Sequence, residues 1–322
     1  MNHHVQNFPA TKPLSVCIVG SGGTGTQIAQ TLAMRGHTDI ALVDLALDMA
    51  IGKSLDIRQS GALLGEDVSI EASDSLDLMR DQNIIIVTAG RGRRPGEPRE
   101  RMLQDNATLI ADIAKRAAVL SPDSYLIILT NPADLLTRVA YEASGFPASR
   151  VMGQGGILDS ARMSTLVANE LGVSVKDVNS MVLGGHGDSM VPVLDFVSIH
   201  GVPAKHLLTE KQWESIVSRT RDGGGEILRK FKTHGAFITP GLSVCDMVDA
   251  LCRKTPRLLP ISTMPSGEYG LTDVFLGLPA LLSNQGVSEV VELPLSEGDL
   301  ASLHKSAEAQ REAWREWKRL PT

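Results

Sequence analysis

The sequence predicts an α/β fold in which a doubly wound parallel sheet is followed by a second unit of mixed α+β structure. Short apolar runs of strand length alternate with helical segments in the first half of the chain. These runs are apolar at nearly every position, as in strands that are buried on both faces. After about residue 150 the alternation becomes irregular. The 322 residues are enough for two such units.

The regular half begins with a strand, a glycine-rich turn, a helix and a second strand, which is a βαβ unit of the usual length. The expected elements of this half are strands over 14–19, 40–43, 83–87 and 125–130, and helices over about 24–35 and 100–120. Apolar side chains on one side of the last helix indicate that it packs on the sheet. Helices are therefore expected on both faces of the sheet.

The second half is predicted to hold a different arrangement. Its expected elements are helices over 158–171 and 211–230, strands around 178–183 and 193–199, and a long terminal helix that begins at Ser296. A capping-box-like start precedes one apolar face of that terminal helix, made of Leu300, Leu303, Ala307, Trp314 and Trp317. We expect a flexible tail over 1–13, a cofactor domain over 14–152 and a substrate domain over 153–322.

Composition excludes several classes of function. The formal charge is 31 − 37 = −6 and aromatic residues make up only 4%, which disfavours nucleic acid as a partner. The apolar runs are too short to span a membrane, and residues 1–13 lack the apolar core of a signal peptide. Cys17, Cys245 and Cys252 form no CxxC pair, and no metal-ligand spacing is present. We expect a reduced, cytoplasmic protein without a metal.

The turn after the first strand reads GSGGTG, from Gly20 to Gly25, and matches the pattern G-x-G-x-x-G between a strand and a helix. Such glycines permit a tight turn and a close approach of the backbone to a pyrophosphate at the helix N-terminus. Asp44 ends the next strand, where a carboxylate can accept the ribose hydroxyls of NAD and would repel the 2′-phosphate of NADP. The motif therefore favours NAD.

Four later stretches concentrate polar residues: TAGRGRRPGEPR after the strand at 83–87, TNP after the strand at 125–130, LDSAR in a helix, and GGHGD. Ligands of open α/β sheets bind where the strands end, so the first two stretches face such a site. Taken alone, Asp159 and Arg162 could form a surface ion pair, and His186 could be a buried histidine between turn glycines.

In this order and spacing, GSGGTG, TAGRGRRPGEPR, TNPADLLT, GFPASRVMGQGGILDSAR and GGHGDSMVP resemble the lactate/malate dehydrogenase family. The resemblance extends from about Ser15 to the C-terminus and is closest to the lactate-dehydrogenase-like malate dehydrogenases. It implies a Rossmann domain that binds NAD, an α+β substrate domain, and a homo-oligomer, either a dimer or a tetramer.

The resemblance also implies roles for individual residues. His186 corresponds to the general acid/base, Asp159 to the carboxylate on its other ring nitrogen, and Arg99 to the arginine that polarises the substrate carbonyl. Arg162 corresponds to the residue that holds the C1 carboxylate and Asn131 to one that touches both substrate and cofactor. The residues that correspond to cofactor contacts are Gly20, Ser21, Gly22, Gly23, Thr24, Gly25, Asp44, Asn106, Leu129, Thr130 and Asn131.

Arg93 occupies the position that separates malate from lactate specificity in this family. A cation there favours the second carboxylate of oxaloacetate over the methyl group of pyruvate. Two departures from the family pattern concern the same pocket. Arg91-Gly92 replaces an apolar residue and proline, and Gly235 replaces a Ser or Thr hydroxyl. The prediction is an NAD-dependent malate dehydrogenase; the alternatives are a lactate or broader 2-hydroxyacid dehydrogenase and a catalytically silent NAD-binding protein.

Overall fold

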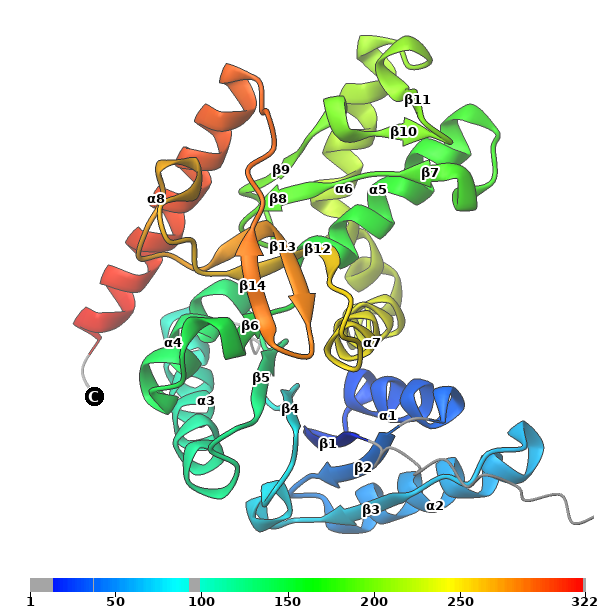
Figure 1. Ribbon diagram of the computed structural model, residues 1–322, viewed down its shortest axis with the longest axis vertical. Helices are drawn as coiled ribbons and strands as arrows, with labels where there is room; N and C mark the ends of the chain where they lie inside the picture. Colours follow the sequence, from blue (N-terminus) through cyan, green and yellow to red (C-terminus); the bar gives the residue numbers. More distant parts are fainter. Residues whose placement is uncertain (1–13, 37, 93–98, 321–322) are drawn as a thin grey trace, which may run out of the picture.

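A continuous sheet runs through the computed structural model, which describes residues 14–36, 38–92 and 99–320 (Figure 1). The strand order is β3-β2-β1-β4-β5-β6-β12-β13-β8-β9, with β14 paired to β13. The parallel strands are β1 Leu14–Val19, β2 Thr38–Val43, β3 Ile70–Ser73, β4 Ile84–Val87, β5 Tyr125–Ile128 and β6 Val151–Gly153. The antiparallel strands are β12 Arg257–Thr263, β13 Leu276–Ser283, β14 Gly286–Val290, β8 Val182–Gly184 and β9 Met190–Pro192.

Helices cover both faces of the parallel part, as the sequence predicts. Val16 and Ile18 of β1 pack in one core with α1 and α7, and Cys17 and Val19 pack in a second core with α3 and α4. Alternate residues of a strand point to opposite faces, so one strand contributes to both cores. The helices are α1 Gly23–Arg35, α2 Leu47–Leu64, α3 Arg99–Leu120, α4 Ala133–Ser144, α5 Gly156–Leu171, α6 Glu210–Phe231, α7 Ile238–Leu251 and α8 Glu297–Arg319.

Two of the predicted strands are wrong in detail. The expected strand at 178–183 is divided into β7 Val178–Asn179 and β8, because the chain passes from one sheet to another between them. β7 belongs to a small sheet with β10 Ser198–Ile199 and β11 Val202–Pro203. The expected strand at 193–199 is interrupted by a 3₁₀ turn at Leu194–Phe196.

The terminal helix α8 confirms its predicted start and its predicted apolar face. The Ser296 hydroxyl accepts the Asp299 backbone N–H at 3.1 Å, which caps the helix. Leu303 and Ala307 are fully buried, and Trp314 and Trp317 pack against the core that holds α3 and α4. Across the part of the chain that is described, no helix combines the length and apolar character that a bilayer crossing requires.

Candidate active site

Three titratable side chains, two from α5 and one from a distant loop, meet beside the sheet. The Asp159 carboxylate lies on the first turns of α5 and accepts a hydrogen bond from Arg162 Nη1 at 3.1 Å. Its other oxygen lies 2.8 Å from His186 Nδ1. The Asp159 side chain is 2% exposed, whereas Arg162 and His186 are 14% and 17% exposed. The carboxylate is thus enclosed, while the cation and the imidazole keep some access to solvent.

His186 lies in a loop that follows β8, and a second carboxylate holds the backbone of this loop. The His186 N–H donates to Asp134 Oδ2 at 2.7 Å, and the Ser262 hydroxyl donates to Asp134 Oδ1 at 2.6 Å. Asp134 is at the start of α4 and is only 4% exposed, and Ser262 belongs to β12. The imidazole is therefore oriented from two sides, through its ring and through its main chain.

These neighbours determine the charge state of His186. Burial alone disfavours the charged imidazolium, but the negative charge and hydrogen bond of Asp159 act in the opposite direction, assisted by Asp134. The carboxylates outweigh burial and the nearby Arg162 cation, so the pKa of His186 lies above its usual value. Because Nδ1 is engaged by Asp159, Nε2 is the nitrogen that can carry a proton to a ligand.

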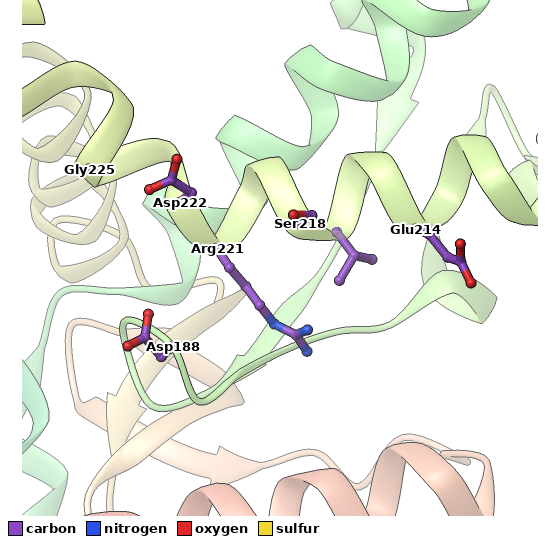
Figure 2. A pocket seen from close by; sticks show the side chains of 7 residues that line it. Asp188, Glu214, Ser218, Arg221, Asp222 and Gly225 are labelled. Atoms are coloured by element: carbon purple, nitrogen blue, oxygen red, sulfur yellow. The ribbon is translucent and has the colours of Figure 1, made fainter. Parts of the chain in front are cut away.

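The opposite side of the His186 loop faces α6. Figure 2 shows Arg221 extending from α6 toward the loop that carries Asp188. An Arg221 N–H donates to the Met190 carbonyl at 3.3 Å, and a cavity of about 510 Å³ lies between this face of α6 and Asp188. The contact ties Met190, at the far end of the loop, to α6.

The glycine turn has the shape that a phosphate group requires. A Cβ at Gly25 would lie 1.8 Å from the Gly20 carbonyl oxygen, so α1 begins directly against the turn. Gly20 has φ +107°, in the region that favours glycine. By contrast, a Cβ at Gly22 would meet no atom within 4 Å, which leaves open space at the helix N-terminus. A ligand can approach the backbone there.

Asp44 is placed where the sequence predicts, at the end of β2 beside this turn. Its carboxylate accepts the Ser21 N–H at 2.6 Å, the Ser21 hydroxyl at 2.9 Å and the Ala46 N–H at 2.9 Å. Burial alone would raise the pKa of Asp44, but these hydrogen bonds and the charge of Lys53 lower it below its usual value. Three donors leave about one acceptor position of the ionised carboxylate for a further hydrogen bond.

A cavity of about 480 Å³ extends from the glycine turn along the ends of the strands. Its lining includes Gly20, Gly22, Asp44, Thr88, Asn106 and Ile113. Asn106 is 2% exposed and is held by backbone groups: it accepts the Arg91 N–H at 3.0 Å and donates to the carbonyls of Arg91 and Asn131. Thr130 donates to the Ala89 carbonyl at 2.7 Å, so both side chains fix loops that border the cavity.

The remaining residues predicted for the cofactor site lie around the same edge. Leu129 is buried after β5, and Asn131 follows it with its side chain exposed. Ser21 is buried beside Asp44, whereas Gly23 is exposed and Thr24 half-buried. Arg93 lies outside the described residues, and Arg99 is the first residue of α3, with its side chain outside the description.

The Arg91-Gly92 departure has a local partner on α3. Arg91 Nε and Nη2 donate to Asp105 Oδ2 at 2.9 and 2.7 Å, which attaches the chain just after β4 to that helix. At Gly235, a Cβ would meet no atom within 4 Å, so the place of the missing hydroxyl is open. Among the described residues, no group of three or more His, Cys, Asp or Glu side chains is arranged to hold a metal.

Sequence reasoning missed Asp134 and Ser262. Asp134 follows the predicted TNP segment within TNPADLLT, but nothing in its spacing indicates that it reaches the backbone of His186, 52 positions away. A charged residue in an otherwise apolar helix start was the available signal. Its near-complete burial requires hydrogen-bond donors, which the structure supplies.

Comparison with known protein families fits this geometry. Residues 14–153 match the family model described as lactate/malate dehydrogenase, NAD binding domain, and residues 157–318 match its alpha/beta C-terminal domain. The chain belongs to the lactate/malate dehydrogenase family. It carries that family's NAD-binding domain and is a member of a family of NAD-dependent oxidoreductases.

Individual relatives are similar over nearly the whole chain. A malate dehydrogenase from Thermomicrobium roseum is 44% identical over 95% of this chain and 98% of its own length. The structure of malate dehydrogenase from Salinibacter ruber has a TM-score of 0.91 at 36% identity, covering 95% of this chain and 98% of that one. A lactate dehydrogenase from Eimeria maxima, solved with NADH and oxamate, has a TM-score of 0.90 at 27% identity and covers 96% of each chain.

Proposed function

We propose that this protein is an NAD-dependent malate dehydrogenase that interconverts (S)-malate and oxaloacetate. The observation that carries the proposal is the contact of His186, Asp159 and Arg162 in one enclosed site. A protonated imidazole beside a guanidinium suits a 2-keto acid, which needs a proton donor at its carbonyl and a cation at its carboxylate. Relatives at 40–44% identity are named malate dehydrogenase.

His186 performs the acid/base step. In the reductive direction the imidazolium gives the proton of Nε2 to the forming alkoxide, and in the oxidative direction the neutral ring takes it back. Asp159 keeps the ring oriented and stabilises the charge that the ring carries before the transfer. Asp134 holds the main chain of the same loop, so the imidazole does not have to reorganise during the reaction.

The residues of the glycine turn and Asp44 fit NAD. The open space at Gly22 would receive the pyrophosphate, and the ionised Asp44 would accept a ribose hydroxyl and repel a 2′-phosphate. Gly20, Ser21, Gly23, Thr24 and Gly25 would shape the turn, and Asn106, Leu129, Thr130 and Asn131 would border the rest of the cofactor. When bound, NADH supplies the hydride for the reduction.

Four side chains are proposed to hold the substrate. Arg162 would bind the C1 carboxylate, and Arg99 would polarise the keto oxygen. Arg93 would bind the second carboxylate of oxaloacetate, and Asn131 would contact both the substrate and the cofactor. A cation for each carboxylate is the physical basis for preferring a dicarboxylate, because a buried carboxylate without a partner is costly.

Initial rates of NADH oxidation with oxaloacetate and with pyruvate test the proposal, with NADPH as a control. We expect a kcat/KM for oxaloacetate that exceeds that for pyruvate by about 10²-fold or more, and a preference for NADH over NADPH. Comparable rates with both acids would favour the broader 2-hydroxyacid dehydrogenase, for which the open space at Gly235 is the structural argument. Absence of turnover with NADH bound would favour a silent NAD-binding protein.

We also propose that the protein is a homo-oligomer with a cofactor domain over 14–152 and a substrate domain over 153–322. Helix α2 supports the oligomer, because Met49, Leu55 and Leu63 on it are 58%, 47% and 92% exposed. Sedimentation equilibrium should give a multiple of the 34.5 kDa chain mass, and a concentration-independent monomer would contradict this.

The three free cysteines fit the proposed cytoplasmic location.

A further inference from the structure

Helix α6 packs against α5 through a face that includes a glycine. Ile216, Thr220 and Gly223 are the buried residues of α6, and their spacing of four and three places them on one side of the helix. The α5 side chain opposite Gly223 is that of Arg162. A Cβ at Gly223 would lie 2.2 Å from Arg162 Cδ, 2.3 Å from Nε and 3.0 Å from Cζ, where ordinary contacts are 3.4–4 Å.

The arginine is held in this position by two acceptors. Its Nη1 donates to Asp159 Oδ1 at 3.1 Å and to the Thr220 carbonyl of α6 at 3.1 Å. These are the hydrogen bonds of Arg162 in the described part of the chain, so other N–H groups of the planar guanidinium remain for a ligand. The two hydrogen bonds hold the Arg162 side chain against the face of α6 that carries Gly223.

A side chain at Gly223 could not be accommodated by moving only the end of Arg162. The overlapping atoms are Cδ, Nε and Cζ, and the last two belong to the planar guanidinium itself. Their displacement moves the whole guanidinium, or else α6 must separate from α5. Either change alters the direction in which the remaining N–H groups point, and bidentate carboxylate binding depends on that direction.

We infer that Gly223 is a positioning residue for substrate binding: the lack of a side chain at this point of α6 provides the space that aims the Arg162 guanidinium at the substrate carboxylate. The inference rests on the proposed function for the identity of the substrate. The contact itself rests on the packing of α5 and α6. The glycine thus contributes through the shape of the helix surface and touches no reacting atom.

The chain offers a matched control in the next residue. Gly224 lies in the same helix but is exposed, and a Cβ there would meet no atom within 4 Å. Alanine at either position removes the same backbone freedom and favours the helix to the same degree. The two substitutions therefore differ in the contact with Arg162, and a general effect of α6 rigidity would appear in both.

The first experiment compares Gly223→Ala and Gly224→Ala in steady-state reduction of oxaloacetate. We expect Gly223→Ala to raise the KM for oxaloacetate by about 10- to 100-fold with a smaller change in kcat, since a misdirected arginine weakens substrate binding. Gly224→Ala should retain the original KM. NADH affinity, measured by fluorescence titration, should be unchanged in both variants. Equal KM values for the two variants would overturn the inference.

A second experiment tests the contact between residue 223 and Arg162 without measuring enzymatic activity. Gly223→Ala should lower Tm in the natural sequence, whereas in an Arg162→Ala background the same substitution should leave Tm equal or higher, because the overlapping atoms are gone. The double variant also serves if Gly223→Ala alone fails to fold. Additive changes in Tm would reject the contact whatever the substrate is. If the Tm changes are not additive but oxaloacetate is not turned over, the contact stands and the proposed function is rejected. The KM comparison would then be made with the 2-keto acid that the protein does reduce.

Discussion

His186→Asn should lower kcat/KM for oxaloacetate by about 10²–10⁴-fold, the usual contribution of a positioned general acid. Asparagine keeps a polar side chain of similar reach but cannot carry a transferable proton near neutral pH. Since Asp134 holds the loop through the backbone N–H of residue 186, the substitution leaves that hydrogen bond available. Unaltered NADH affinity is the control. Full activity in this variant would remove His186 from the acid/base role.

The pH dependence of the natural protein gives the same group a second test. Because Asp159 and Asp134 raise the pKa of His186, the protonated ring persists to higher pH than an isolated histidine would allow. The kcat/KM for reduction should therefore be constant at low pH and fall as pH rises through this raised pKa. Asp159→Asn removes one of the two charges, so the decline should move to lower pH. A pH profile that does not move would contradict the electrostatic role of Asp159.

Arg93→Gln is expected to give the largest change in substrate preference. Loss of the cation leaves the second carboxylate of oxaloacetate without a partner, and at about 3–4 kcal/mol for a broken buried pair kcat/KM should fall roughly 10²–10³-fold. The kcat/KM for pyruvate should rise, because its methyl group would no longer lie beside an unpaired cation. The readout is the ratio of kcat/KM for the two acids, measured with saturating NADH.

Arg94→Gln is the matched control for this experiment. It removes the same charge from the same loop at the adjacent residue. If the ratio responds to the overall charge of the loop, both variants will change it by similar amounts. If Arg93 contacts the second carboxylate, only Arg93→Gln will change it. A ratio that is unaffected by Arg93→Gln would exclude Arg93 as the selector.

In the parallel half, the sequence predicted β1, β2, β4, β5, α1 and α3 because their signals are local, whereas it did not predict α2, β3 and α4. An uninterrupted apolar run such as Ile84–Val87 is buried on both faces in any parallel sheet, and the glycine turn lies between adjacent elements. Helix α7 was not predicted, since its Pro240 and Gly241 are signals against a helix. Proline is tolerated in the first turn, and burial of α7 against α1 and β13 stabilises the helix against its weak propensity.

The short strands β7 and β8 illustrate a different limit. Their sequence has the composition of a strand, but the choice between two sheets depends on partners elsewhere in the chain. β7 pairs with β10, whereas β8 pairs with β13 and β9. Pairing between distant segments leaves no local pattern, so the division between Asn179 and Val182 is decided by tertiary structure.

For the site, the sequence by itself determined which chemical groups are available: a glycine turn with Asp44, proposed for a nucleotide, and a histidine, a carboxylate and arginines, proposed for a 2-keto acid. Only the tertiary structure decided how these groups are held. Asp134 supports His186 from 52 positions away, and Gly223 leaves space for Arg162 across a helix contact. Such contacts depend on burial and on distances between elements. They follow from the packing of the whole chain and have no signature in the spacing of residues along it.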